Sequence, residues 1–423
     1  MRHSAAEIPA SCYVAQMLMA IFDKSFIHSI TAEEAAVFDM HFMSNLTPLF
    51  FVEVLADLEK FGLDDEEARA ALVRSLAGKT PSTRSYPNMP HHEMALHELL
   101  GHPIEMRGVP LVAGGRRVQS AEGLGTVFEH PPEMKAASRW SEGIFGEEEY
   151  ASARKWRELL RRAPESLNVF TNGPGTRFSF KDLAAVKQYA EKIIDRDGVR
   201  FRNLRAALEI FQVPEHARPA IIARWKLEGG PKLSDFAPYA RHIMLIDLFR
   251  TLAMASGHID PDKSSNFADM AYLYYLPFCQ AFVSGDKLHR RCVPLFLRKR
   301  QQFVWAHDLR THLSQLAQDY LNDPLLPELG LFRLSGKMSF APESFIGALF
   351  SRAGLGQRGS SDDRTGSLTP EAERALVERL TRAAEAPPPT PDADLSEEDV
   401  NTTIIRSIPL RRGRFPMMPR GVQ

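Results

Sequence analysis

The sequence predicts an α/β protein with a central parallel sheet flanked by helices, split by a large, mostly helical insertion and followed by a flexible C-terminal tail. Three observations predict this class. Apolar, strand-like segments alternate with helical segments near both ends of the main body. The middle of the chain has helical spacing with capping residues ahead of the helices. The end of the chain is rich in Pro, Gly and charged residues, which is typical of segments without a packed core.

The change of texture along the chain divides it into four segments. The first contains the apolar run "MAIF", the helical stretch "TAEEAAVFDMHFMSN" and "LTPLFFVEVLADLEK", which is expected to pass from a strand into a helix. The β/α alternation returns in "RHIMLIDLFRTLAMAS", "QAFVSG" and "QFVWAHDLRTHLSQLAQDYL". The predicted boundaries are 1–60 and 241–330 for the two parts of the sheet domain, 61–240 for the insertion, and 331–423 for an extension and largely disordered tail.

Composition limits the classes of protein and of partner. A chain of 423 residues, 44% hydrophobic and 25% charged, is long enough for one large globular domain and an elaboration. Because 52 basic residues stand against 53 acidic ones, any nucleic-acid surface must be local. The widely spaced Cys12, Cys279 and Cys292 argue against a disulfide scaffold and a structural zinc site, so a cytoplasmic location is expected.

The apolar run from Val14 to Phe22 is too short to span a bilayer and has no small-residue cleavage site after it. It is therefore expected to be a core strand, and no membrane partner is predicted.

Four acidic residues lie at the ends of predicted elements. Asp23 follows the strand "MAIF", and Asp286 lies just past "QAFVSG", while Glu53 and Asp269 are expected in the first turns of helices. Strand carboxyl ends and the helix starts above them meet at one edge of an α/β sheet, so we expect these side chains to gather there. Helix capping or a turn explains any one of these acids alone, but less readily all four in this order.

Carboxylates held close together repel and raise one another's pKa values. A hard divalent cation removes this conflict, because Mg²⁺ and Mn²⁺ prefer oxygen ligands. Such an ion can also activate water for attack on a phosphodiester bond. The pattern of acids therefore points to metal-dependent hydrolysis.

The segments "IFDKSFI", "LTPLFFVEVLADL" and "NFADMAYLYYLPFCQAFVSGDKL" resemble the acidic signatures of PIN-like nuclease domains. In that family an N-terminal strand ends in Asp, a Glu lies early in a helix, and a helix with an Asp precedes a strand that ends in Thr or Ser, one more residue and Asp. The stretch "FVSGD" is the most specific part of the match. The resemblance implies an Mg²⁺- or Mn²⁺-dependent endoribonuclease acting on single-stranded RNA, with single-stranded DNA as the other possible substrate. It implies the metal ligands and catalytic residues Asp23, Glu53, Asp269 and Asp286, assisted by the hydroxyls of Ser25 and Ser284.

The long insertion departs from the family's compact domains. It would cover the cleft, regulate the site, or bind an inhibitory or regulatory protein partner. A second hypothesis is therefore a catalytically silent PIN-like adaptor that binds a partner.

A basic stretch follows Asp286 and contains no acid. Beside a metal cleft it would bind a phosphate backbone without reading sequence, and otherwise it is a solvated helix face. The predicted nucleic-acid-binding residues are Lys287, Arg290, Arg291, Arg298, Lys299 and Arg300.

The hexamer "HELLGH" suggests a zinc peptidase as a minor alternative, because it is the literal motif of the dipeptidyl-peptidase III family. The usual zinc helix places two His four positions apart on one face. Here His97 and His102 are five positions apart, about 140° around a helix axis. The acidic helix that completes the site in that family has no good match downstream, so these histidines are expected to end a helix.

Overall fold

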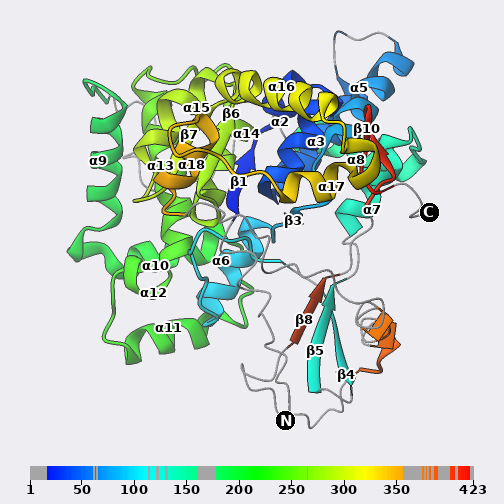
Figure 1. The fold of residues 1–423 in the computed structure, drawn as a ribbon. Coiled ribbons are helices and arrows are strands. Elements are labelled where there is room, and N and C mark those ends of the chain that lie inside the picture. The colour runs from blue at the N-terminus through cyan, green and yellow to red at the C-terminus, as the bar shows by residue number, and fades with distance from the viewer. Residues whose placement is uncertain are drawn as a thin grey trace.

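The computed structural model describes residues 17–60, 62, 65–112, 115–120, 123–128, 132–159, 178–263, 265–355, 374–375, 378, 381–382, 385–388, 401–404 and 408–419. Its main body is an α/β fold around a five-stranded parallel sheet with helices packed around it (Figure 1). The predicted α/β class is thereby confirmed. In this part of the chain, no helix combines the length and apolar character needed to cross a membrane.

The central sheet has the strand order β3-β2-β1-β6-β7, and every neighbouring pair is parallel. β1, β2 and β6 are buried along their whole length, as parallel strands are when helices cover both faces of a sheet. The strands are β1 (Leu18–Phe22), β2 (Phe42–Leu46), β3 (Ser85–Pro87), β6 (Ala281–Ser284) and β7 (Gln302–Trp305).

The pairing of β1 with β6 joins chain segments that are far apart in sequence. Ala20 pairs with Ala281 and Phe22 with Val283, so the residues after both strands emerge side by side. This parallel pairing is the one on which the predicted meeting of Asp23 and Asp286 depended.

Two boundaries differ from the prediction. β2 comes from the end of the stretch expected to be helical, where α3 (Ala32–His41) stops just before Phe42. β3 belongs to the central sheet, although residues 61–240 were assigned to the insertion. Because β3 has only three residues, it is too short for an alternating pattern to reveal it.

Helices from both parts of the sheet domain surround the sheet. Capping explains several of their starts: Thr31 and Glu34 form a reciprocal capping box at α3, and Thr47 caps α4 ahead of Pro48. The helices are α2 (Lys24–Ser29), α3, α4 (Pro48–Leu55), η1 (Ala56–Glu59), α5 (Glu66–Lys79), α14 (Ser265–Ala271), η3 (Tyr272–Phe278), α15 (Lys287–Cys292), η4 (Val293–Leu295) and α16 (Ala306–Asn322).

The described part of residues 88–255 is mostly helical. It contains α6 (His91–Leu100), α7 (Pro132–Ser141), α8 (Glu147–Leu159), α9 (Leu183–Ile194), η2 (Asp197–Val199), α10 (Arg200–Ile210), α11 (Arg218–Leu227), α12 (Leu233–Phe236) and α13 (Pro238–Ala255). α13 is buried over most of its surface and packs against α9, α6 and η3. A small second sheet pairs β4 (Arg116–Ser120) with β5 (Gly123–Phe128) antiparallel and β5 with β8 (Asn401–Ile404) parallel, and it lies at the lower end of Figure 1.

Parts of the predicted extension and tail are packed onto the main body. They include α17 (Leu326–Gly336), α18 (Phe345–Arg352), β9 (Arg411–Arg412) and β10 (Phe415–Pro416). Phe415 and Met417 are fully buried. Gly330 has φ 69°, and a Cβ at this position would lie 2.5 Å from the backbone of Met418.

Arg412 explains why this segment is anchored. Its guanidinium donates to Asp39 Oδ2 over 2.6 Å and to the carbonyls of Lys79 and Thr80 over 2.9 and 2.6 Å. A buried cation with these partners ties the chain end to the start of β3. Most of residues 356–407 of the predicted tail, and residues 420–423, lie outside the described residues.

Candidate functional site

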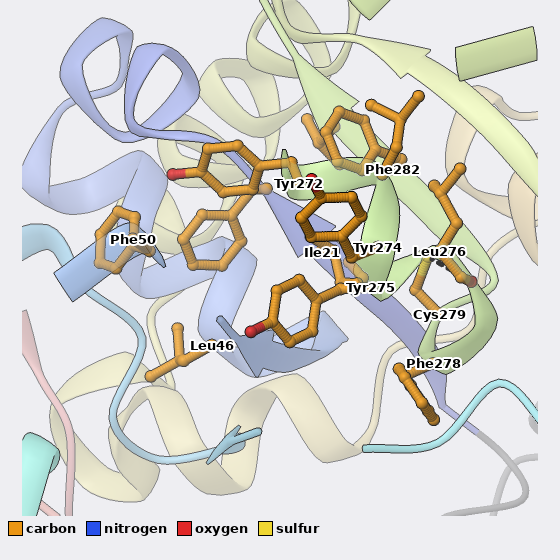
Figure 2. Close-up of a cluster of buried hydrophobic side chains, with 14 of the residues drawn as sticks. Ile21, Leu46, Phe50, Tyr272, Tyr274, Tyr275, Leu276, Phe278, Cys279 and Phe282 are labelled. Carbon is orange, nitrogen blue, oxygen red and sulfur yellow. Dashed lines mark hydrogen bonds between the residues drawn. The ribbon is translucent and has the colours of Figure 1, made fainter. Parts of the chain in front are cut away.

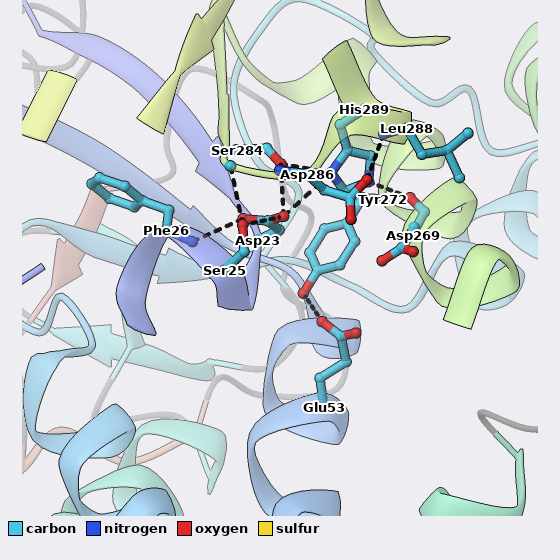
Figure 3. A network of polar contacts seen from close by, with 11 residues as sticks. Asp23, Ser25, Phe26, Glu53, Asp269, Tyr272, Ser284, Asp286, Leu288 and His289 are labelled. Carbon is cyan, nitrogen blue, oxygen red and sulfur yellow. Dashed lines mark hydrogen bonds and ion pairs between the residues drawn. The ribbon is translucent and has the colours of Figure 1, made fainter. Parts of the chain in front are cut away.

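The candidate site lies where the strand order of the central sheet changes direction. β2 and β3 follow β1 on one side, whereas β6 and β7 lie on its other side. In α/β sheets, the carboxyl ends of the strands at such a switch point form a crevice where ligands bind. Asp23, directly after β1, and Ser284, the last residue of β6, occupy this position (Figure 3).

Asp23 is buried and bonded on several sides. Its carboxylate accepts hydrogen bonds from the hydroxyl of Ser25 over 2.7 and 2.8 Å, from the amide of Phe26 over 3.0 Å and from the hydroxyl of Ser284 over 2.7 Å. Asp23 is therefore both the N-cap of α2 and a link between β1 and β6. The predicted supporting hydroxyls both contact this one acid.

His289 is a central residue of the site that the sequence did not single out. It is fully buried on α15, with Nδ1 2.8 Å from Ser284 Oγ and 3.3 Å from Asp23 Oδ2, and Nε2 2.6 Å from the carbonyl of Asp269. The single hydroxyl hydrogen of Ser284 points to Asp23, so Ser284 accepts from Nδ1, while the carbonyl can only accept from Nε2. Both ring nitrogens therefore donate, and the imidazole carries a positive charge.

The electrostatics of this pair agree with its geometry. Burial alone would lower the pKa of His289, but the hydrogen bond and the negative charge of Asp23 outweigh it and raise the pKa to about 9. Burial alone would raise the pKa of Asp23, but His289, Ser284 and Ser25 hold it below its ordinary value. The basic stretch contained His289, but only the burial of one face of α15 distinguishes it from the exposed cations beside it.

Glu53 approaches the site from α4, whose first residue is Pro48, so it lies in the second helical turn and not in the first. Its Oε2 accepts a hydrogen bond from the hydroxyl of Tyr272 over 2.5 Å. Burial raises the pKa of Glu53 to about 7 against the opposing charge of Lys24, and the charges of Asp269 and Asp23 raise it further.

Asp269 reaches the same region from α14, also beyond the first residues of its helix. Burial raises its pKa to about 6 against the charge of His289, and the charges of Asp286 and Asp23 add to the rise. Within the part of the chain that the structure describes, Asp269 Oδ2 is a buried oxygen without a hydrogen-bond partner.

Asp286 is partly exposed and caps α15, where its Oδ1 accepts from the amide of Leu288 over 2.5 Å. Its own amide donates to Ser284 Oγ over 2.9 Å. The four predicted acids thus reach one region from β1, α4, α14 and the end of β6, and their charges influence one another.

The four acids are the possible ligands of a divalent cation at this site. The described residues contain no group of three or more His, Cys, Asp or Glu side chains already arranged around a metal position. However, the site offers oxygen donors of the kind that Mg²⁺ and Mn²⁺ take, and Asp269 Oδ2 has no hydrogen-bond partner among the described residues. The chemistry of the donors fits such an ion, while the arrangement is that of acids bonded to the protein's own donors.

Three of the predicted nucleic-acid-binding residues, Lys287, Arg290 and Arg291, lie on α15 directly after β6, at the carboxyl edge of the sheet. Arg298, Lys299 and Arg300 instead precede β7, which runs parallel to β6, so they lie at the opposite, amino edge and do not flank the candidate site. Lys287, Lys299 and Arg300 are exposed. The guanidinium of Arg290 lies 4.9 Å from the ring centre of Trp305, which pairs with Ser284 in the sheet register. Arg291 donates to the carbonyl of His258, and Arg298 donates to the carbonyl of Met106. Two of the six cations are thus partly engaged in holding chain segments together.

The glutamate of the "HELLGH" sequence, Glu98 on α6, has a structural role. Glu98 is buried, and its carboxylate accepts from the backbone amides of Tyr239 and Ala240, over distances of 2.9 to 3.1 Å, at the start of α13. His97 and His102 are exposed, and α6 ends between them at Gly101. The expectation that these residues end a helix is confirmed, and the peptidase alternative is left without a free glutamate.

Comparison with known proteins gives no assignment: no protein-family model, no curated protein and no solved structure matches this chain.

Proposed function

We propose that this protein is a metal-dependent endoribonuclease with a PIN-like domain, split by a helical insertion and acting in the cytoplasm. The observation that carries the proposal is the gathering of Asp23, Glu53, Asp269 and Asp286 at the switch point of a parallel sheet. These acids come from four chain segments, two near residue 40 and two near residue 280, that meet only in the folded protein.

The incomplete charge compensation supports a role beyond stability. A structural carboxylate is normally satisfied by its neighbours, whereas burial raises the pKa values of Glu53 and Asp269, and Asp269 retains an unbonded oxygen among the described residues. Asp23, Glu53, Asp269 and Asp286 would hold one or two Mg²⁺ or Mn²⁺ ions. When bound, such an ion supplies positive charge beside a phosphodiester and makes water a better nucleophile.

The chain's own groups would prepare the site for this chemistry. Ser25, Ser284 and His289 fix the carboxylate of Asp23, and Tyr272 fixes that of Glu53. The exposed Lys287 and Arg290, on α15 at the carboxyl edge, would bind the substrate's phosphates without reading its sequence. Single-stranded RNA is the proposed substrate, with single-stranded DNA as the alternative.

The test is cleavage of end-labelled single-stranded RNA and DNA by the purified protein with Mn²⁺ or Mg²⁺. We expect cleavage of RNA that is stopped by a chelator and reduced by Asp286→Asn at least about 100-fold, the usual cost of removing one charge-stabilising group. Asp262→Asn is the matched control, because Asp262 is an exposed acid shortly before α14 and should leave the rate unchanged. Cleavage that survives both the chelator and Asp286→Asn would come from a contaminant and would refute the proposal.

A catalytically silent adaptor is the second candidate, and one observation favours it. Asp23 and Glu53 already bond to donors of the protein, and no described group of acids surrounds a metal position. Absence of cleavage for both RNA and DNA, in a protein that also binds no Mn²⁺, would support this candidate over the nuclease.

A further inference from the structure

The hydroxyl of Tyr272 is the donor that holds the carboxylate of Glu53. The distance from the hydroxyl to Glu53 Oε2 is 2.5 Å, which is typical of a strong hydrogen bond to a charged acceptor. Tyr272 is fully buried, and burial, followed by the charges of Glu53 and Asp23, raises its pKa well above the ordinary value for tyrosine. In this geometry the hydroxyl donates and the carboxylate oxygen accepts.

The ring of Tyr272 is fixed on both sides. It packs edge-on against His289, with ring centres 5.8 Å apart, and against Phe282 of β6 at 6.2 Å. Tyr272 is also the first residue of η3, directly after the helix that carries Asp269. Figure 3 shows its ring between Asp23 and Asp269, with the hydroxyl pointing toward Glu53. The hydroxyl thus connects Glu53, from the first part of the sheet domain, to the second part.

The neighbouring tyrosines of η3 provide a contrast. Tyr274 and Tyr275 are buried in the same aromatic cluster, as Figure 2 shows. Tyr274 donates to Asp247 on α13 over 2.6 Å, and Tyr275 contacts the backbone amide of His91 over 3.0 Å. All three tyrosines pack in the core, but only Tyr272 among these three bonds to one of the four acids.

We propose that Tyr272 is the positioning residue that orients Glu53 toward the divalent cation. This inference rests on the proposed function, and it assigns a role to a residue outside the four acids. A partner that fixes a ligating carboxylate without touching the metal typically contributes 10- to 100-fold to metal affinity. Without the hydroxyl, Glu53 would lose its fixed orientation and would spend part of its time turned from the other acids.

The experiment compares Mn²⁺ affinity, measured by isothermal titration and by electron paramagnetic resonance, in three metal-free proteins. Tyr272→Phe removes the hydroxyl that bonds Glu53, whereas Tyr274→Phe removes a hydroxyl that bonds a buried carboxylate outside the site. We expect the dissociation constant to rise about 10- to 100-fold in Tyr272→Phe and to change less than about twofold in Tyr274→Phe. Both substitutions keep the ring, so both proteins should fold.

A double-mutant cycle with Glu53→Gln checks that the effect passes through Glu53. Once Glu53 is replaced, adding Tyr272→Phe should weaken Mn²⁺ binding by less than about twofold. Equal affinities of the wild type and Tyr272→Phe would refute this inference and leave the nuclease proposal standing. Absence of Mn²⁺ binding to the wild type would refute both. If Tyr272→Phe weakens binding equally with and without Glu53→Gln, the hydroxyl acts on the fold and not on Glu53, which also refutes the inference.

Discussion

Acids lie at both the amino edge and the carboxyl edge of the central sheet, where its parallel strands begin and end. The acids at the two edges differ in how completely the protein's own donors satisfy their hydrogen bonds. At the amino edge, Asp39 accepts from the backbone amides of Ser82, Thr83 and Arg84, each over 2.9 Å, and from Arg412 over 2.6 Å. At the carboxyl edge, the pKa values of Glu53 and Asp269 are raised, and Asp269 keeps an unbonded oxygen among the described residues.

This difference separates a structural acid from candidate functional ones. Asp39 fixes the start of β3 and the end of the chain, and no hydrogen-bonding capacity is left for a ligand. The buried charges of Glu53 and Asp269 cost stability at the carboxyl edge, and such a cost is typical of functional sites.

The largest expected effect is on the amino edge. Asp39→Ala should lower the free energy of unfolding by about 3–5 kcal/mol, because it leaves Arg412 buried without its charge partner. Urea unfolding measures this loss. Arg411→Ala is the control, since the neighbouring Arg411 is exposed and should change stability by less than about 0.5 kcal/mol. Equal effects of the two substitutions would mean that Asp39 is not the structural acid described above.

The second effect is on the carboxyl edge, where added cation should stabilise the protein. At a Mn²⁺ concentration 100 times the dissociation constant, we expect the free energy of unfolding to rise by about 2.7 kcal/mol. Asp269→Asn should remove most of this rise, whereas Asp262→Asn should keep it. A rise that persists in Asp269→Asn would place the ion elsewhere.

The third effect concerns the stability cost of Glu53. Burial raises its pKa from 4.5 to about 7, so the folded protein binds this proton more tightly than the unfolded chain. The stability that the protonated Glu53 side chain contributes is therefore fully present below pH 4.5, and it is lost as the pH rises to about 7. Because the side chain is partly exposed, we expect Glu53→Gln to stabilise the metal-free protein by only about 1 kcal/mol above pH 7.

Chemical unfolding of the metal-free proteins between pH 4 and pH 8 tests this sign. The wild type should lose stability relative to Glu53→Gln across that window. A variant that is less stable than the wild type at pH 8 would show that Glu53 is a stabilising acid like Asp39.

The smallest effect distinguishes the exposed cations of the carboxyl edge from the buried Arg412. Lys287→Ala should weaken RNA binding severalfold, by about 0.5–1 kcal/mol, and should reduce the slope of log affinity against log salt by about 1. Fluorescence anisotropy with labelled RNA at several salt concentrations measures both. Glu343→Ala, at an exposed acid outside this edge, should leave the slope unchanged.

The sequence by itself determined the α/β class, the strands β1 and β6, and the acids Asp23 and Asp286 that follow them. These features are local: a run of apolar residues is buried as a strand, and a polar residue ends it. The same local patterns could not show β3, because three residues carry no period, or the start of α4, because apolar residues continue through β2 and α4 alike.

Only the tertiary structure decided how the acids are bonded. No pattern in the sequence links His289 or Tyr272 to the acids, yet they contact Asp23 and Glu53 across more than 200 positions of chain. Arg412 is likewise one of several arginines near the end of the sequence, and only its contact with Asp39 in the folded protein distinguishes it from the others. Whether a buried carboxylate is satisfied depends on the donors that distant segments bring to it, and no local pattern records those distances.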